Sequence, residues 1–234
     1  MDSLFKRYDV KTASAWILGH TRRTGVPNLP KELIDKISED CSDEELGRIV
    51  LAGQEAGLKL YPFKTGTQKL ARSRRTMGFL HSIMFDTMLD VGSGRGVFLI
   101  PFMKEFPWVK ITSLELLEKR VTFLNELAEG GFTQLHVEQK DICDKPFPDD
   151  SFDVVTMLEV LEHIPEVEKA VDAAVKMAKQ YVVVTVPSKP DNNPEHIHML
   201  TKDILTQLFA AAGCTRLHFD GVEGHLFMVA AVGE

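Results

Sequence analysis

Three ionisable side chains follow an apolar run in the stretch VVTMLEVLEHIPE, which covers residues 154–166. Glu159, Glu162 and His163 lie within five positions of one another. Charged groups are costly in a protein interior unless something pairs with them, so this turn either lies in solvent or faces a ligand, a metal or a substrate. If the segment makes one helical turn, the three side chains share a face. They could then bind a divalent cation or take a proton from a substrate.

A second segment with histidines, PSKPDNNPEHIHMLT at residues 187–201, also follows an apolar run. Both segments are expected at the same edge of a parallel sheet, so they could contribute to one site. His196 and His198 are separated by one residue, and in an extended segment they point to opposite sides. At most one of them is therefore expected to join the three residues of the first segment in holding Mg²⁺ or Mn²⁺.

A glycine-rich loop, LDVGSGRG at residues 89–96, lies between an apolar run and a helical pattern. Gly92, Gly94 and Gly96 allow the backbone to turn sharply and to approach a ligand closely. The first turn of the following helix offers backbone N–H groups that have no partner within the helix. In open parallel sheets, ligands bind beyond the carboxyl ends of the strands, where this loop is expected.

The residues around these glycines discriminate between cofactors. A dinucleotide fingerprint G-x-G-x-x-G that begins at Gly92 needs a third glycine at position 97, where the chain has Val97. No G-K-[ST] sequence follows, so the P-loop pattern also fails. Asp90 would repel a pyrophosphate, but a carboxylate there can bind a cationic ligand or an amine. S-adenosylmethionine carries both a sulfonium and an ammonium group.

The order of the elements predicts an α/β sheet. Mostly apolar or alternating runs are typical of strands at residues 87–92, 110–115, 134–139, 152–158 and 181–187. Helical patterns occur at residues 96–106, 117–130, 166–180 and 202–213. Two further strands, at residues 215–222 and 225–232, are joined by a link too short for a crossover helix, so this pair must be antiparallel.

The loop, the strand pattern and the acids at the strand ends resemble the class I S-adenosylmethionine-dependent methyltransferases over about residues 84–232. The resemblance implies a seven-stranded, mostly parallel Rossmann-like sheet with helices on both faces and a terminal antiparallel hairpin. It also implies that Glu115 binds the ribose hydroxyls and that Asp141 contacts the adenine amine, with Ile142 beside the ring. The cofactor-binding residues that it implies are Asp90, Gly92, Ser93, Gly94, Gly96, Glu115, Leu116, Asp141, Ile142 and Leu158.

Spacing supports the ribose role independently, because Glu115 lies 23 positions after Gly92 and a ribose-binding acid is expected about 20 residues on. The alternative is that Glu115 and Asp141 are surface acids at strand ends, since acids are mostly exposed. Their occurrence in register with Asp90 favours a shared cofactor pocket.

The E-x-x-E-H sequence at residues 159–163 resembles metal-using O-methyltransferases. One such group methylates the terminal ribose 2′-hydroxyl of small RNAs, and another methylates hydroxyls of quinone precursors. A metal would lower the pKa of an acceptor hydroxyl and orient it. The alternative is a site without metal, where positioning and desolvation supply most of the rate. His163 is then the first candidate for general base, and Glu159 is the second.

The first part of the chain differs in character from the rest. Residues 1–80 show helical spacing and charge blocks, and they are predicted to form a helical cap before a methyltransferase domain at residues 81–234. Ser42 begins SDEEL with Glu45 three positions later, which predicts a capping box. We expect the cap to close over the acceptor site.

A local excess of positive charge occurs at residues 63–75, in FKTGTQKLARSRR. Its basic residues are Lys64, Lys69, Arg72, Arg74 and Arg75. The segment could bind a phosphate group or an RNA end, or it could be the solvated face of an amphipathic helix. The second interpretation is favoured, because aromatic residues suited to base stacking are sparse there.

Composition sets further bounds on the 234-residue chain. Its formal net charge of −7 argues against non-specific coating of nucleic acid. Cys41, Cys143 and Cys214 give neither a disulfide framework nor a metal knuckle, which favours a reducing cytoplasm. The stretch MDSLFKRYDV has no long apolar core, so neither a signal peptide nor a membrane anchor is expected. Oligomeric state is not predicted by the sequence.

Three hypotheses follow. The leading one is an S-adenosylmethionine-dependent methyltransferase whose acceptor is unassigned, with a hydroxyl or amine of a small molecule as the expected class. The second is a metal-assisted RNA terminal ribose 2′-O-methyltransferase. The third belongs to another class, a nucleotide-binding oxidoreductase or a non-catalytic S-adenosylmethionine-binding protein. Asp90 and Val97 count against the oxidoreductase.

Overall fold

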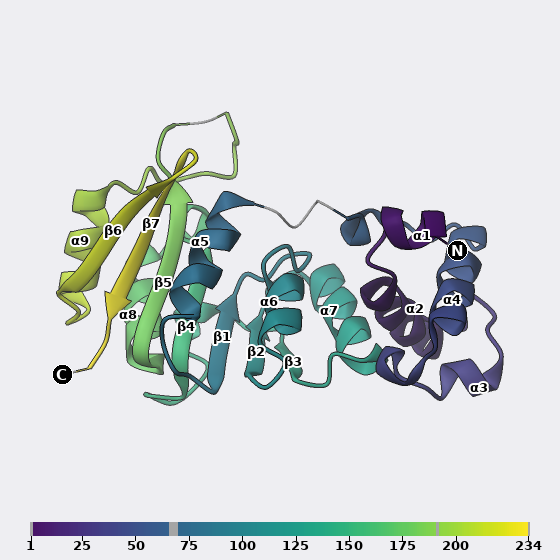
Figure 1. The fold of residues 1–234 in the computed structure, drawn as a ribbon. Helices are drawn as coiled ribbons and strands as arrows, with labels where there is room; N and C mark the ends of the chain where they lie inside the picture. The colour runs from purple at the N-terminus through teal and green to yellow at the C-terminus, as the bar shows by residue number, and fades with distance from the viewer. Residues whose placement is uncertain (1, 66–69, 191, 234) are drawn as a thin grey trace. The chain divides into compact units, whose positions relative to one another are not determined.

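The computed structural model describes residues 2–65, 70–190 and 192–233, and its strands form one seven-stranded sheet (Figure 1). The strands lie in the order β3-β2-β1-β4-β5-β7-β6. They are β1 (Thr87–Val91), β2 (Lys110–Leu114), β3 (Leu135–Glu138), β4 (Phe152–Leu158), β5 (Ala178–Pro187), β6 (Arg216–Val222) and β7 (His225–Ala231). β1 is parallel to β2 and β4, and β4 is parallel to β5, whereas β7 is antiparallel to β5 and β6. The predicted Rossmann-like sheet with a terminal antiparallel hairpin is confirmed.

The chain divides into two compact units. The first combines Met1–Lys69, Gly94–Pro107 and Leu117–Val137, and the second combines Leu70–Ser93, Trp108–Leu116 and Glu138–Glu234. The first unit holds α1 (Asp2–Arg7), α2 (Val10–Thr24), α3 (Lys31–Ile34), α4 (Asp43–Glu55), α6 (Leu99–Glu105) and α7 (Glu118–Gly130). The second holds α5 (Ala71–Leu80), α8 (Val167–Met177) and α9 (Lys202–Ala211). The division into residues 1–80 and 81–234 stays a prediction. Within the described ranges, the structure has no helix with the length and apolar character needed to cross a membrane.

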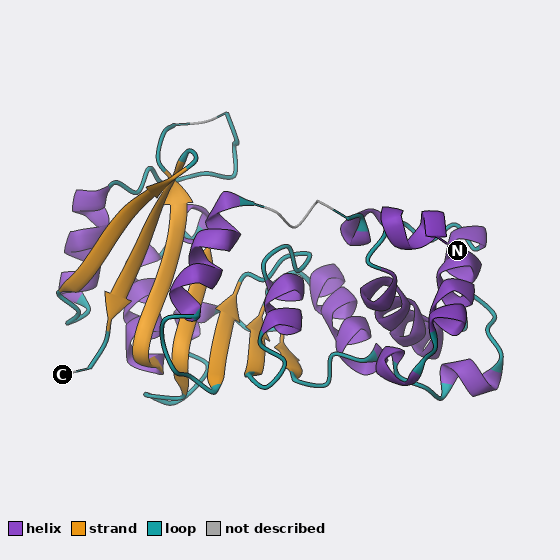
Figure 2. Cartoon of the chain, in the orientation of Figure 1, coloured by secondary structure: helices purple, strands orange, loops and turns teal. Residues whose placement is uncertain are grey.

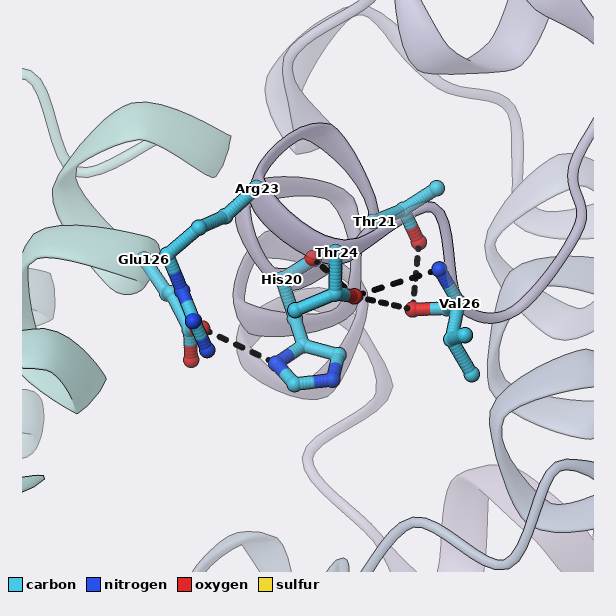
Figure 3. Close-up of polar contacts among 6 residues, drawn as sticks. All are labelled: His20, Thr21, Arg23, Thr24, Val26 and Glu126. Carbon is cyan, nitrogen blue, oxygen red and sulfur yellow. Dashed lines mark hydrogen bonds and ion pairs between the residues drawn. The ribbon is translucent and has the colours of Figure 1, made fainter.

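Helices α2 and α7 of the first unit cross at glycines. A Cβ atom on Gly19 would lie 2.0 Å from the backbone oxygen of Glu126, and Gly130 approaches α2 even more closely. A larger residue at either position would force the helices apart. Beside the crossing, the buried Glu126 carboxylate lies 2.9 Å from His20 Nδ1 and accepts a hydrogen bond from Arg23 Nε at 2.7 Å (Figure 3). This pairing offsets the cost of burying the carboxylate.

The predicted capping box lies at the start of α4. Glu45 N donates to Ser42 Oγ at 3.3 Å, and Ser42 N donates to Glu45 Oε2 at 2.8 Å. The reciprocal pair satisfies two backbone donors at the helix start, and the prediction is confirmed.

Helices cover both faces of the strands in the second unit, as the purple and orange elements of Figure 2 show. On one face, Val182, Val184 and Val186 of β5 belong to a buried cluster that also contains apolar residues of α8 and α9. On the other face, the ring of Phe79 in α5 packs edge-on against Tyr181, with 5.2 Å between ring centroids. The faces alternate because successive side chains of a strand point in opposite directions.

Two predicted helix boundaries differ from the structure. The helix predicted over residues 166–180 ends at Met177, because Ala178 already begins β5 and pairs with Phe152 of β4. The helix predicted from residue 96 begins only at Leu99, because turns occupy the preceding residues.

Candidate functional site

The glycine loop leaves β1 through a turn that requires a glycine at its first position. Gly92 has a φ of 67°, and a Cβ atom there would lie 2.7 Å from a methyl carbon of Val160. Its N–H donates to the backbone oxygen of Leu114 at 2.8 Å, which ties the loop to β2. Gly94 and Gly96 also have positive φ values, of 60° and 72°. The sequence therefore specifies this loop through its glycines.

Asp90 lies immediately before the loop, and its side chain is buried at 3% exposure. Burial raises the pKa of the Asp90 carboxyl to about 6, and the negative charge of Glu115 adds to this effect. Hydrogen bonds from Ser93 and Thr156 oppose the rise in pKa, and Thr156 Oγ1 donates to Asp90 Oδ1 at 2.6 Å. Asp90 thus carries an electrostatic cost that a cationic ligand would relieve.

Glu115 follows β2 and is also buried, at 4% exposure, so it is not a surface acid. Its N–H donates to the backbone oxygen of Glu138 at 3.1 Å, and its Oε1 accepts from Leu116 N at 3.0 Å. Ser113 of β2 donates from Oγ to Ser93 Oγ of the glycine loop at 2.7 Å. The acids of β1 and β2 are therefore held side by side at the carboxyl edge of the sheet.

The region after β3 forms an open depression. It is lined by Leu116, Gln139, Lys140, Asp141, Asp144 and Pro146. Asp141 caps a short 3₁₀ helix by accepting from Cys143 N at 2.9 Å. Leu116 is 57% exposed, whereas Ile142 is buried in the core cluster. Leu116 and Asp141 thus share one accessible surface, while the Ile142 side chain faces inward.

The turn after β4 differs from the predicted helical turn. Leu158 ends β4 and is half-buried, and Glu159 then takes a left-handed conformation with a φ of 60°. Glu159 N donates to Thr185 O of β5 at 2.9 Å, and a 3₁₀ helix begins only at Leu161. The prediction of one helical turn over residues 159–163 is wrong, because pairing with β5 continues through Glu159.

The Glu159 side chain consequently contacts β5 and β7. Its Oε1 accepts from Thr185 Oγ1 at 2.9 Å, and its Oε2 lies 3.0 Å from His225 Nε2. His225 was not singled out from the sequence. It is the first residue of β7 and pairs with Pro187 at the end of β5, so the antiparallel register of the predicted hairpin could have indicated its place at this edge.

Glu162, His163 and His196 come together in a separate cluster. One ligand atom from each lies within 4.8 Å of the others, and the Glu162 side chain is fully buried. The rings of His163 and His196 are 4.8 Å apart, and His163 Nδ1 donates to Glu195 O at 2.9 Å. The backbone oxygen of Glu162 accepts from the N–H groups of residues 197 and 198, which holds the later segment in place.

Two residues of the predicted cation set lie elsewhere. Glu159 bonds to Thr185 and His225, and His198 Nε2 donates to the backbone oxygen of Ile164 at 2.9 Å. The three remaining residues keep the donor types of a metal site, and metal binding stays a prediction.

Two arginines of the basic segment contact acids of the β6–β7 hairpin. Arg75 Nε donates to Asp220 at 2.9 Å, and Arg74 lies 4.0 Å from a Glu223 carboxylate oxygen. Lys69 lies outside the described residues. The contacts of Arg74 and Arg75 support a structural role for this part of α5.

Comparisons with known proteins agree with this geometry. Residues 89–184 match a family model described as a methyltransferase domain. Ribosomal RNA small subunit methyltransferase G of Listeria monocytogenes is 45% identical over 53 residues, which are 22% of each chain. YcgJ of Bacillus subtilis, an uncharacterized methyltransferase, is 32% identical over 96 residues, which are 40% of this chain and 36% of YcgJ. The matches thus span between about a fifth and just over a third of these relatives.

Comparison with solved structures shows that the fold of the chain is also similar to that of known proteins. The crystal structure of YcgJ has a TM-score of 0.61 at 15% identity and covers 70% of this chain and 98% of its own. A SAM-dependent methyltransferase from Aquifex aeolicus has a TM-score of 0.60 at 20% identity and covers 71% of this chain and 92% of its own. The chain therefore has the Rossmann-like fold of class I methyltransferases, with a segment that matches the methyltransferase domain.

Proposed function

We propose that the chain binds S-adenosylmethionine and transfers its methyl group to a hydroxyl or amine of a small molecule. The observation that carries this proposal is the pair of buried acids, Asp90 and Glu115, at the ends of neighbouring parallel strands. Two like charges in a buried place are costly unless a ligand compensates them. A nucleoside with an ammonium group and ribose hydroxyls has the groups that would do so.

The donor types around the loop fit the parts of this cofactor. Glu115 offers an acceptor to the ribose hydroxyls, and Asp141 offers one to the adenine amine beside the exposed side chain of Leu116. The backbone at Gly92, Gly94 and Gly96 supplies the close approach for the methionine portion. When bound, the cofactor supplies an activated methyl group, and the chain contributes positioning and desolvation.

His163 is the proposed general base for a site without metal. Its Nδ1 carries a hydrogen, because it bonds to the Glu195 carbonyl, which only accepts. In the neutral ring, Nε2 then holds the lone pair that takes a proton from the acceptor. Glu159 is the second candidate for this role.

A metal-assisted reaction on RNA ribose is the second candidate function. Glu162, His163 and His196 supply one carboxylate and two imidazoles, a donor set that suits Mn²⁺ better than Mg²⁺, which prefers oxygen. The Glu195 carbonyl at His163 Nδ1 is the type of outer partner that orients a histidine ligand. The partial match to a ribosomal RNA methyltransferase favours RNA, whereas the acid contacts of Arg74 and Arg75 favour a small acceptor.

Calorimetry separates the proposal from its alternatives. Purified protein is titrated with S-adenosylmethionine, S-adenosylhomocysteine and NAD, and uptake of the first two without the third is expected. Asp90→Asn should weaken this uptake, while Asp86→Asn, at an exposed acid before β1, should leave it unchanged. Binding of NAD alone would support an oxidoreductase.

Release of S-adenosylhomocysteine is then measured with a panel of phenols, catechols, primary amines and short RNAs, with and without a chelator. We expect turnover of a phenol or an amine, and we expect this turnover to continue in the presence of the chelator. Turnover of RNA that the chelator stops would favour the second function. Cofactor binding with no turnover on any panel member would favour the non-catalytic binding protein.

A further inference from the structure

The contact between Glu159 and His225 requires a proton between its two atoms. His225 Nδ1 lies 3.1 Å from the backbone oxygen of Glu223, and His225 Nε2 lies 3.0 Å from Glu159 Oε2. A carbonyl oxygen only accepts, so Nδ1 carries a hydrogen. A carboxylate oxygen also only accepts, so a second proton must lie at the Nε2 contact. The two contacts thus hold the imidazole ring at both of its nitrogens.

The Glu159 carboxylate is fixed from several sides. Its other oxygen accepts from Thr185 Oγ1, and its own N–H donates to the Thr185 backbone oxygen. A φ of 60° is unfavourable for a residue with a side chain, and such strain persists where surrounding contacts enforce it. The side chain remains 19% exposed at the carboxyl edge of β4, where ligands of parallel sheets bind.

His225 is fixed by the turn that precedes it. Ser188 N, directly after β5, donates to the backbone oxygen of Gly224 at 2.9 Å. The Glu223 carbonyl sets the ring orientation, and the Glu223 side chain lies 4.0 Å from Arg74 of α5. The hairpin turn is thereby attached to β5 and α5, and it holds the imidazole against Glu159.

We infer that His225 is a positioning residue that, with Thr185, holds the Glu159 side chain toward the atom to be methylated. The inference rests on the proposed methyl transfer, and it assigns the acceptor to compounds that lose a proton in the reaction. The acceptor lone pair forms the bond to the methyl carbon while the carbon–sulfur electron pair returns to sulfur. The inference gives the base role to Glu159, the second candidate, in place of His163, so the proton of the acceptor passes to the Glu159 carboxylate.

An analogue tests this placement before any acceptor is known. Sinefungin carries a protonated amine where S-adenosylmethionine carries its methyl group, whereas S-adenosylhomocysteine has a neutral thioether there. A Glu159 side chain that accepts a hydrogen bond from this amine should make wild type prefer sinefungin by about tenfold. Glu159→Gln should remove the preference, and His225→Gln should reduce it severalfold. His218→Gln, at an exposed histidine of β6, is the matched control and should keep it.

The ring nitrogens of His225 give an independent readout. In a long-range ¹H–¹⁵N spectrum, Glu159→Gln should shift the Nε2 resonance of His225 more than the Nδ1 resonance, because Nε2 faces Glu159 and Nδ1 faces the Glu223 carbonyl. An Nε2 resonance that Glu159→Gln leaves unchanged would overturn the inference, as would a sinefungin preference that Glu159→Gln leaves intact. Failure of wild type to bind either nucleoside would instead overturn the proposed function on which the inference rests.

Discussion

The carboxyl edge of the sheet holds two pairs of acids that differ in how they are stabilised. Asp90 and Glu115 lie at the ends of adjacent strands, where both are buried and the negative charge of Glu115 adds to the rise in the pKa of Asp90. Glu159 and Glu162 follow a single strand, yet their side chains reach separate histidine contacts. The first pair places two acids at neighbouring strand ends, whereas Glu159 of the second pair is bonded to Thr185 of β5 and contacts His225 of β7.

The difference shows what each pair requires from the rest of the chain. The strand-end pair, Asp90 and Glu115, is brought together by the parallel pairing of β1 with β2 alone. The turn pair, Glu159 and Glu162, depends on other segments of the chain. Glu159 contacts Thr185 of β5 and His225 of β7, and Glu162 lies near His196 in the segment after β5. Variants in each pair should therefore affect different properties.

The largest effect is expected from Gly92→Ala, which acts on the turn between the two pairs. The new Cβ would combine a left-handed backbone with a clash against Val160, and we expect a loss of about 4 kcal/mol in the free energy of unfolding. Gly57→Ala is the matched control, because Gly57 has a φ of 78° with no atom near its Cβ position. Chemical denaturation measures both, and equal losses would contradict a role for Val160.

Asp90→Asn should change the pH dependence of stability. A pKa of about 6 in the folded state, against an ordinary 3.8, means that the folded protein binds the Asp90 proton more tightly than the unfolded chain does. The wild type should therefore lose about 3 kcal/mol of stability as pH rises from about 4 to about 7. The variant has no such proton, so its stability should fall less over this range. Urea unfolding at several pH values measures this. An equal fall of the unfolding free energy with pH in wild type and variant would contradict the raised pKa of Asp90.

Glu162→Gln and Glu159→Gln distinguish the two residues of the turn pair. Under the metal-assisted alternative, Glu162→Gln should weaken Mn²⁺ binding by at least about 100-fold, because it removes the only carboxylate of the donor set. Glu159→Gln should leave Mn²⁺ affinity unchanged, since its carboxylate lies with His225. Electron paramagnetic resonance titration measures both. If Glu159→Gln weakened Mn²⁺ binding and Glu162→Gln did not, Glu159 would be a metal ligand, as the sequence predicts.

The smallest effect is expected from Arg75→Ala, which removes the contact of α5 with Asp220. Both partners are substantially exposed, so the loss of thermal stability should be small and should shrink further at high salt. Arg48→Ala, at an exposed arginine of α4, should have no effect. A large loss that persists at high salt would show that the position of Arg75 over the Phe227 ring matters more than the ion pair.

The sequence predicts β1, β4 and β5 well because their apolar runs reflect burial on both faces. All seven strands lie within a few residues of their predicted positions, and the antiparallel hairpin follows from its short link. The boundary between α8 and β5 was misplaced because Ala178, Lys179 and Gln180 suit a helix locally, while pairing with β4 decides their conformation. The sequence around residues 178–180 does not show that these residues pair with another strand instead of continuing the helix.

In the candidate site, too, some features can be predicted from the local sequence and others cannot. The positions of Asp90, Gly92 and Glu115 follow from strand ends and glycine spacing, which are local properties. The direction of the Glu159 side chain depends on a hydrogen bond to Thr185, and the importance of His225 depends on its place opposite Pro187. Both depend on contacts between segments that are far apart in the sequence.

The two-residue link between β6 and β7 fixes which side of the sheet the His225 ring occupies. Side chains alternate along a strand, so lengthening or shortening this link by one residue would send the imidazole to the opposite face. The identity of every residue at this edge of the sheet would be unchanged, yet Glu159 would lose its contact with His225. The length of this link therefore decides whether the contact between Glu159 and His225 forms, and loop engineering could vary the length to test that contact.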